Sequence, residues 1–379
     1  MLARKSMASG GYSIVENVQA LASEKLDQVP ARYIRAETQL DLLLVDESLH
    51  VPVIDFGKLV ADDGESANIE ELAKLHLACK DWSFYQVINH GISVEVIEKM
   101  KRDMKEFFEL PLEDKLAYAR EPSNIEGYGQ GFIVTEDQKL DWGDMFFVIS
   151  HPVKLRNDRF WPTAPSTFRK GTRIFLKHLE SNTCARETMD QYSKEVQGLA
   201  EMLLRLMGRN LGLDPEMLPS LFVGGVQSLR MNYYPPCKEA DKVMGRTPHT
   251  DSTGLTLLVQ ANEVSGLEIR RAGKWVPIKP VQGAIIVNIG DIFEIMSNGE
   301  YKSVEHRVVV NPKNERMSIA AFHSPCMSAM VGPISGLVTV TGTKYDTVSY
   351  EEYMKMVMAR KLAGKGMISS SEGRYSMNF

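Results

Sequence analysis

Two histidines and one aspartate in the last third of the chain have the types and spacing of metal ligands. His249 and Asp251 are two residues apart, and His306 follows 55 residues after Asp251. Two imidazoles and a carboxylate can occupy one face of an octahedral Fe(II) ion and leave the other face open for a co-substrate and dioxygen. Residues i and i+2 of a strand point to the same side, so His249 and Asp251 can act together. His306 must come from another strand that the fold brings alongside.

A second pair with the same spacing follows. Arg316 and Ser318 are two residues apart and open a strand-like segment, residues 316–322. A guanidinium group can hold both oxygens of a carboxylate, and a neighbouring hydroxyl can add a third hydrogen bond. The pair therefore predicts a site for a carboxylate-bearing ligand.

Each motif alone carries little information, because short patterns such as H-x-D and R-x-S occur often by chance. A single histidine in a β-rich region is more often a packed or surface residue than a ligand. Order and flanking sequence favour the metal site. His249 and Asp251 stand between a turn-like segment, residues 245–248, and a β-rich run, residues 254–260, while His306 lies in another β-rich run, residues 301–310.

The elements that must position these residues change in kind along the chain. Apolar residues recur at three- and four-residue intervals in the first half, as in amphipathic helices, whereas short β-rich runs separated by Gly, Pro and Asn dominate from residue 226 onward. The predicted helices span residues 15–23, 69–80, 94–108, 190–211 and 350–362, the last of them over the pocket mouth. The clearest predicted strands span residues 51–56, 266–270, 274–278 and 284–289.

Several short strands at such spacing predict a mainly β fold with flanking helices and a double-stranded β-helix, or jelly-roll, core. We expect an N-terminal arm (1–50), a helical and strand region (51–165), an insertion with a long helix (166–225), the jelly-roll core (226–330) and a C-terminal helix with a tail (331–379).

Composition agrees with a soluble enzyme, and we expect it in the cytoplasm. The net charge is −5 and the pI is about 6.0, so we expect no nucleic-acid or membrane partner. The four cysteines show no regular spacing, which predicts reduced thiols. No apolar run is long enough to span a bilayer, and the first residues do not resemble a secretory signal. Translation could start at Met1 or Met7, and a monomer is the default expectation.

The chain resembles the plant Fe(II)- and 2-oxoglutarate-dependent dioxygenases over nearly its whole length. The resemblance is carried by residues 51–55, 82–91, 107–111, 127–129, 140–142, 230–237, 288–291, 297–299 and 303–307. Within that family, residues 136–142 and 230–234 are most similar to the codeine demethylase and lateral branching oxidoreductase branch.

The resemblance implies roles for individual residues. His249, Asp251 and His306 would bind Fe(II). Arg316 and Ser318 would hold the distal carboxylate of 2-oxoglutarate, and Asn232 and Tyr234 would help to hold this co-substrate near the metal. The expected reaction consumes 2-oxoglutarate and O2, with ascorbate as reductant, and releases succinate and carbon dioxide.

The resemblance also implies a pocket for a hydrophobic plant small molecule with a phenolic or methoxy group, which would be hydroxylated or O-demethylated. The candidate pocket residues, each of which could instead be ordinary core packing or a surface residue, are Phe322, Arg230, Tyr128, Phe132, Met145 and Phe147. Two alternatives stay open. One is a desaturase or ring-forming oxidase of the same family, and the other is a jelly-roll protein that binds a ligand without turnover.

Two segments depart from the family pattern. Ser83 stands where glycine is typical, and Tyr85 adds a hydroxyl that needs a partner. Residues 170–186 have the look of an insertion between Arg169 and Glu187. They are either a genuine surface excursion or sequence retained by alternative splicing or an imperfect gene model, and we favour the second account.

Overall fold

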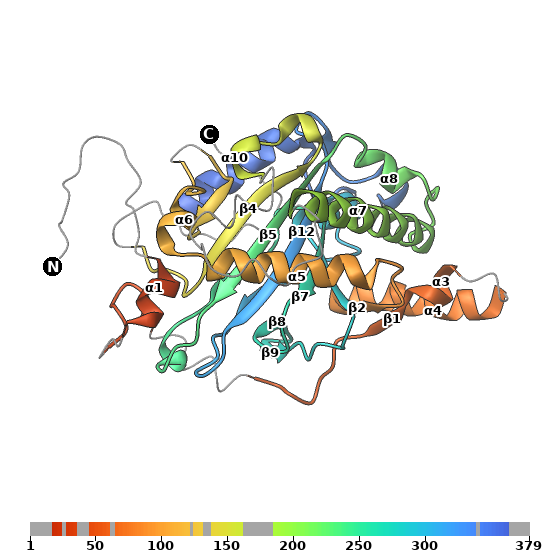
Figure 1. Ribbon diagram of the computed structural model, residues 1–379. Coiled ribbons are helices and arrows are strands. Elements are labelled where there is room, and N and C mark those ends of the chain that lie inside the picture. The colour runs from red at the N-terminus through yellow and green to blue at the C-terminus, as the bar shows by residue number, and fades with distance from the viewer. Residues whose placement is uncertain are drawn as a thin grey trace.

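The protein is described by a computed structural model that covers residues 17–24, 28–35, 45–60, 65–121, 124–131, 138–161, 185–338 and 342–363. Two sheets form its β core, with helices packed against it (Figure 1). The larger sheet has the strand order β1 (Val53–Asp55), β2 (Phe84–Ile88), β10 (Ile285–Ile289), β7 (Leu255–Gln260), β12 (Arg316–Ser324), β5 (Val226–Tyr234), β4 (Asp144–His151) and β3 (Gly127–Gly129). The smaller has the order β6 (Arg246–His249), β11 (His306–Val308), β8 (Leu267–Arg271) and β9 (Lys274–Pro277), and β13 (Met330–Val331) pairs with β14 (Val348–Ser349).

This arrangement confirms the predicted jelly roll with flanking helices. Apart from the parallel pair β1 and β2, the strand pairs of the two sheets are antiparallel. The larger sheet takes β1 to β4 from the first half of the chain and the other strands from the second half, so the two halves share one sheet.

Helices cover one side of the larger sheet. α5 and α7 lie across it (Figure 1), and α7 contacts β4, β5, β7 and β12. The helices are α1 (Val18–Ser23), α3 (Phe56–Val60), α4 (Glu65–Leu77), α5 (Val94–Glu109), α6 (Leu112–Leu116), α7 (Ala185–Asn210), α8 (Met217–Leu221), α9 (Asp291–Met296) and α10 (Tyr350–Ala363). A π-helical turn occupies Ala78–Trp82, and short 3-10 turns occupy Val153–Leu155, Asp158–Phe160, Ala240–Lys242 and Ser335–Leu337.

β12 shows how the larger sheet separates core from site. Its odd-numbered residues Met317, Ile319 and Ala321 are buried in the main apolar cluster together with side chains of α5 and α7. Successive side chains of a strand point to opposite faces. The even-numbered residues, which include Arg316 and Ser318, therefore point away from the helices, toward the interior of the roll.

Several predicted boundaries move by a few residues. The strand expected over 51–56 is shorter, because Phe56 already begins α3. The helix expected from residue 190 begins at Ala185, and the helix expected from residue 69 begins at Glu65 and passes into the π-helical turn at Ala78. Residues 15 and 16 and most of the segment 170–186 lie outside the described residues.

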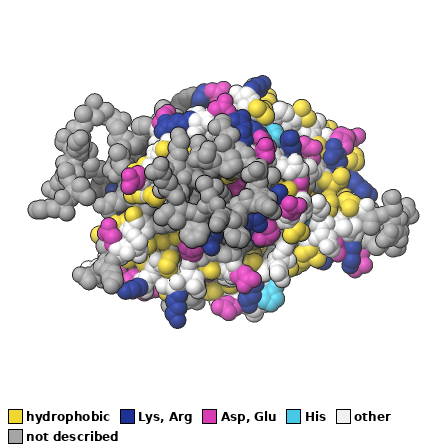
Figure 2. Space-filling model, in the orientation of Figure 1, with side chains coloured by type: hydrophobic (Ala, Val, Ile, Leu, Met, Phe, Trp, Pro, Cys, Tyr) yellow, Lys and Arg dark blue, Asp and Glu magenta, His cyan; other side chains and the backbone are white. Residues whose placement is uncertain are grey.

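The surface in Figure 2 carries basic and acidic side chains interspersed over the described residues, in keeping with the small net charge. Among the described helices, none combines the length and the apolar content needed to cross a bilayer.

Candidate metal and co-substrate site

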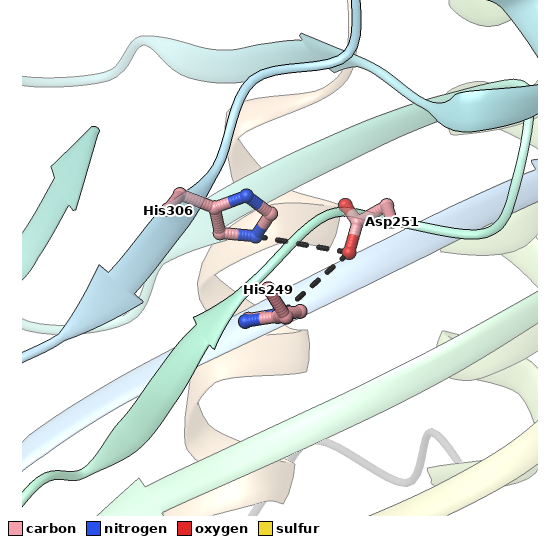
Figure 3. Close-up of side chains that lie close together, drawn as sticks. All are labelled: His249, Asp251 and His306. Atoms are coloured by element: carbon pink, nitrogen blue, oxygen red, sulfur yellow. Dashed lines mark ion pairs between the residues drawn. The ribbon is translucent and has the colours of Figure 1, made fainter. Parts of the chain in front are cut away.

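The register of the smaller sheet brings the two histidines together. β11 pairs with β6 so that His306 lies opposite His249, and their ring centroids are 4.2 Å apart. Asp251 follows two residues after the end of β6. Its Oδ1 atom lies 3.7 Å from the Nε2 atom of each histidine, and Figure 3 shows the three side chains converging. One ligand atom from each residue lies within 4.8 Å of the other two.

Backbone carbonyls fix which nitrogen of each ring faces the cluster. Nδ1 of His249 lies 2.8 Å from the carbonyl oxygen of Thr247, and Nδ1 of His306 lies 3.2 Å from that of Val304. A carbonyl oxygen can only accept, so each Nδ1 carries the proton and each Nε2 keeps a lone pair. Burial, and then the neighbouring His306 and Arg246, hold the pKa of His249 well below its usual value. Both features leave His249 neutral with a lone pair available, as a metal ligand requires.

The carboxylate of Asp251 is oriented by two residues that were not predicted to act at the site. Thr256 Oγ1 donates to Asp251 Oδ2 at 2.7 Å, and Asn288 Nδ2 donates to the same oxygen at 2.8 Å. Oδ1 is thereby left to face the histidines. Thr256 and Asn288 are register partners in β7 and β10, so their meeting at Asp251 depends on strand pairing that the sequence does not display.

The loop that carries Asp251 packs tightly against the start of α9. Asp291 N–H donates to the Asp251 carbonyl at 2.7 Å. A Cβ atom at Gly290 would lie 2.1 Å from the carbonyl oxygen of Thr253 and 3.0 Å from that of Asp251. Only glycine lets the backbone at position 290 come this close to the loop, so Gly290 is needed for the loop to pack against α9.

Arg316 is a buried cation whose hydrogen-bond partners among the described residues are neutral. It is 1% exposed, and its NH1 and NH2 groups donate to Ser318 Oγ at 3.4 Å and Gln260 Oε1 at 3.3 Å. Its Nε has no partner among the described residues. Asn232 Nδ2 also donates to Ser318 Oγ at 3.4 Å, and the ring centroid of Tyr234 lies 5.5 Å from the guanidinium carbon.

Burial lowers the pKa of Arg316, which reflects the cost of holding a cation away from water without an anion. A carboxylate ligand would supply that anion and the missing acceptor for Nε. The donor sets therefore fit both expected groups: Nε2, Nε2 and Oδ1 fit Fe(II), and the Arg316 fork beside Ser318 fits one carboxylate of 2-oxoglutarate.

Four of the six pocket candidates lie on the inner face of the larger sheet. Met145 pairs with Asn232, and Phe147 pairs with Arg230. Cross-strand partners share a face, so these side chains lie on the same face as Asn232. Phe322 is on the even-numbered side of β12. The structure thus brings Arg230, Met145, Phe147 and Phe322 to the interior of the roll.

Tyr128 was expected in the pocket but lies on the opposite face. It pairs with Phe146 and packs against Phe107 and Phe108 under the helices, with 3% of its surface exposed. The i, i+2 rule gives the relative direction of side chains along a strand, but it does not say which face meets the helices. For Tyr128 the alternative, ordinary core packing, is the one that the structure shows. Phe132 lies outside the described residues.

Comparison with known proteins places this geometry in a family. The 2OG-Fe(II) oxygenase superfamily model matches residues 225–325, and the model described as non-haem dioxygenase in morphine synthesis N-terminal matches residues 51–164. S-norcoclaurine synthase 1 of Coptis japonica is 48% identical and covers 95% of this chain and 96% of its own. Codeine O-demethylase of Papaver somniferum is 40% identical and covers 93% and 95%. A crystal structure of JOX2 in complex with 2OG, Fe and JA aligns with a TM-score of 0.78 and 32% identity, over 90% of this chain and 93% of that one.

Proposed function

The chain belongs to the 2OG-Fe(II) oxygenase superfamily and is an Fe(II)- and 2-oxoglutarate-dependent dioxygenase, and we propose that it hydroxylates or O-demethylates a hydrophobic plant small molecule. One oxygen atom of O2 enters the substrate, and the other enters the succinate formed with carbon dioxide. On a methoxy carbon, hydroxylation gives a hemiacetal that releases formaldehyde and leaves a free hydroxyl.

We assign the metal to the Nε2 atoms of His249 and His306 and to the Oδ1 atom of Asp251. The observation that carries this assignment is their convergence, with each Nδ1 committed to a backbone carbonyl. Fe(II) bound there supplies the activation of O2, with 2-oxoglutarate as the source of two electrons. These three side chains would hold the ion, and coordination positions would remain for the co-substrate and O2.

We assign the distal carboxylate of 2-oxoglutarate to Arg316 and Ser318. Two features support this role: the Nε of Arg316 has no partner, and no carboxylate accepts a hydrogen bond from this guanidinium, among the residues that the structure describes. Asn232 orients the Ser318 hydroxyl, and the Tyr234 ring lies beside the guanidinium. Together they orient the co-substrate, because a fork-to-fork contact fixes direction as well as position.

We assign substrate positioning to Phe322, Phe147 and Met145, whose side chains share the inner face with Ser318 and Asn232. Apolar side chains there would exclude water from the reacting carbon and favour a hydrophobic substrate. The 40% identity to codeine O-demethylase supports a methoxy-bearing substrate.

We further propose that the enzyme is a cytoplasmic monomer of specialised metabolism, that ascorbate keeps its iron reduced, and that residues 51–165 and 226–330 work as one unit. The sharing of one sheet by strands of both regions supports the last point.

The test is succinate release from 2-oxoglutarate by the purified protein with Fe(II), ascorbate and a panel of methoxylated plant aromatics. Formaldehyde and the substrate mass are measured in parallel. We expect release that depends on one panel member, with its mass increased by one oxygen or decreased by CH2. A loss of two hydrogens would indicate a desaturase or ring-forming oxidase instead.

His306→Ala is the matched control, because it removes one proposed ligand without changing the inner face of the larger sheet. We expect it to lose turnover by more than about a thousandfold, since removal of a metal ligand removes the chemistry it supports. Turnover at the wild-type rate in this variant would remove His306 from the ligand set.

A further inference from the structure

A short helix without a metal ligand connects the C-terminal segment, residues 345–353, with both regions that carry the ligands. The two carboxyl side chains of α9, Asp291 and Glu294, are buried, with 0% and 5% of their surface exposed. They are three residues apart, so they lie on one side of the helix. Each accepts one hydrogen bond from a tyrosine of the C-terminal segment and another from a ligand-bearing region. These regions are the Asp251 loop, residues 250–254, and the His306 segment, residues 303–306.

Asp291 joins the Asp251 loop to α10. Its backbone N–H donates to the Asp251 carbonyl at 2.7 Å. Its Oδ2 atom accepts from Thr250 Oγ1 at 3.2 Å and from the hydroxyl of Tyr353 at 3.1 Å. Thr250 stands between the ligands His249 and Asp251. One carboxyl oxygen therefore connects the loop that carries two ligands with the C-terminal helix.

Glu294 makes the corresponding connection to the third ligand. Its Oε2 atom accepts from the N–H of Ser303 at 2.6 Å, three residues before His306, and its Oε1 atom accepts from the hydroxyl of Tyr345 at 2.6 Å. A buried carboxyl oxygen that loses its donor is destabilised. Both tyrosine hydroxyls therefore contribute to keeping the α9 carboxyl groups where the ligand-bearing regions meet them.

The C-terminal segment is attached to the roll by further contacts of its own. Within it, β14 pairs with β13, and the Tyr350 hydroxyl donates to Ser324 Oγ at the end of β12, at 2.9 Å. The same hydroxyl oxygen lies 3.4 Å from the carbonyl oxygen of Ser252 in the Asp251 loop. The segment is thus fixed in place and can support the ligand-bearing regions.

We propose that Tyr345 and Tyr353 are positioning residues for the metal. Their hydroxyls act through the two carboxyl groups of α9, which hold the His306 segment and the Asp251 loop at the separation that Fe(II) requires. The inference rests on the proposed function, because it concerns the same three ligands. When ligands are in place before the metal arrives, binding orders fewer groups, so loosening either region weakens binding although no ligand is lost.

The experiment measures the Kd of Mn(II) for the metal-free full chain from the electron paramagnetic resonance signal of free Mn(II). The wild type is compared with Tyr345→Phe and Tyr353→Phe, each of which removes one hydroxyl and keeps the ring. We expect the Kd to rise about three- to tenfold in each variant. This is less than the ten- to hundredfold loss typical when a direct partner of a metal ligand is removed, because the tyrosines act one residue further out.

Removal of the α9 carboxyl groups tests the route of the effect. If Tyr353 acts through Asp291, Tyr353→Phe should change the Kd less than about twofold in an Asp291→Ala background. Tyr345→Phe should behave in the same way in a Glu294→Ala background, and this second pair keeps the test valid if Asp291→Ala does not fold. An undiminished effect of the tyrosine substitutions in these backgrounds would overturn the route.

Two control variants separate positioning from general stability. Tyr192→Phe removes a buried hydroxyl of α7 that has no partner among the described residues, and we expect the wild-type Kd. Leu203→Val opens a small cavity in the main apolar cluster, so it should lower the midpoint of urea denaturation and leave the Kd within about twofold of the wild type. A wild-type Kd in both tyrosine variants, or an equal rise in Leu203→Val, would overturn the inference.

Turnover separates this inference from the proposed function. With a substrate from the succinate assay, the tyrosine variants should need about three- to tenfold more Fe(II) for half-maximal release, with a rate at saturating Fe(II) within about twofold of the wild type. A lower rate at saturating Fe(II) with an unchanged Kd for Mn(II) would overturn the positioning role and leave the dioxygenase reaction intact. Tyrosine-dependent Mn(II) binding without oxidation of any compound would support the positioning role and count against the proposed reaction. A wild type that does not bind Mn(II) would overturn both.

Discussion

Two buried arginines nine residues apart, Arg307 and Arg316, differ in how their charge is compensated. Arg307 donates from Nε to Glu268 Oε2 at 2.7 Å, and its guanidinium carbon lies 4.1 Å from the ring centroid of Trp275. Arg316 is as deeply buried, but within the described part of the chain it donates to the neutral side chains of Ser318 and Gln260. The fold supplies a carboxylate for Arg307, whereas Arg316 has the position of a cation that receives its anion from a ligand.

The difference separates a structural charge from a binding charge. A buried ion pair contributes little net stability when formed, yet removing one partner is costly because the other charge stays buried. A buried cation without a partner anion has the opposite property. Replacing such a cation changes the free energy of unfolding of the unliganded protein little. When an anion binds to it, the folded state is stabilised.

The largest effect is expected at the compensated site. Arg307→Met removes the buried cation that pairs with Glu268, whose side chain stays in the interior with 6% of its surface exposed. We expect a loss of about 3–5 kcal/mol in the free energy of unfolding, measured by urea denaturation. The double variant Arg307→Met, Glu268→Leu should recover most of it. Wild-type stability in the single variant would contradict the structural role of the pair.

Arg316→Met should show the reverse pattern. The concentration of 2-oxoglutarate needed for half-maximal succinate release should rise about ten- to a hundredfold, because a charge-assisted contact of roughly 1.5–3 kcal/mol is lost. The free energy of unfolding without 2-oxoglutarate should stay within about 1 kcal/mol of the wild type. Arg316→Lys, which keeps the charge but not the fork, should fall between the two. An unchanged co-substrate requirement would remove Arg316 from the proposed role.

The sequence could predict the ligand types but not their supports. His249 with Asp251, and Arg316 with Ser318, show the i, i+2 spacing of a strand, and this spacing is visible without a fold. Thr256 and Asn288 reach Asp251 only through the pairing of β7 with β10.

The same limit explains the other differences. Arg246 and Asp141 are 105 residues apart, and no local pattern links them. Tyr128 was misplaced because a three-residue strand, Gly127–Gly129, shows too little alternation to reveal its buried face. Chain-distant contacts and the choice of face arise from packing, whereas the jelly roll itself follows from many short strands.

Asp144 extends the comparison to a buried acid whose hydrogen-bond donors are neutral. The N–H groups of Val18 and Gln19 donate to its carboxylate at 3.2 and 2.8 Å, but burial outweighs them and raises the pKa of Asp144 to about 6. The folded state therefore holds this proton more tightly than the unfolded chain, whose carboxyl has a pKa of 3.8. The resulting stability is full below about pH 4 and is lost as pH rises through about 6.

Asp144→Asn should remove this pH dependence. The free energy of unfolding of the wild type minus that of the variant, measured by urea at several pH values from 4 to 7, should fall with pH. The slope should be at most about 1.4 kcal/mol per pH unit. A difference that does not vary with pH would mean that Asp144 is ionised throughout.

The smallest effect concerns a backbone cost at Ser83. Its φ is 60°, in the left-handed region, and its Oγ donates a long hydrogen bond, 3.5 Å, to the carbonyl of Cys79. Glycine adopts this conformation without the steric cost of a Cβ atom, but it also has more freedom in the unfolded chain. We expect Ser83→Gly to raise the free energy of unfolding by about 0.5–1 kcal/mol in urea denaturation. Ser83→Ala keeps the Cβ and removes the hydroxyl, so it should not be stabilised. If both variants changed stability equally, the effect would come from the hydroxyl and not from the backbone conformation.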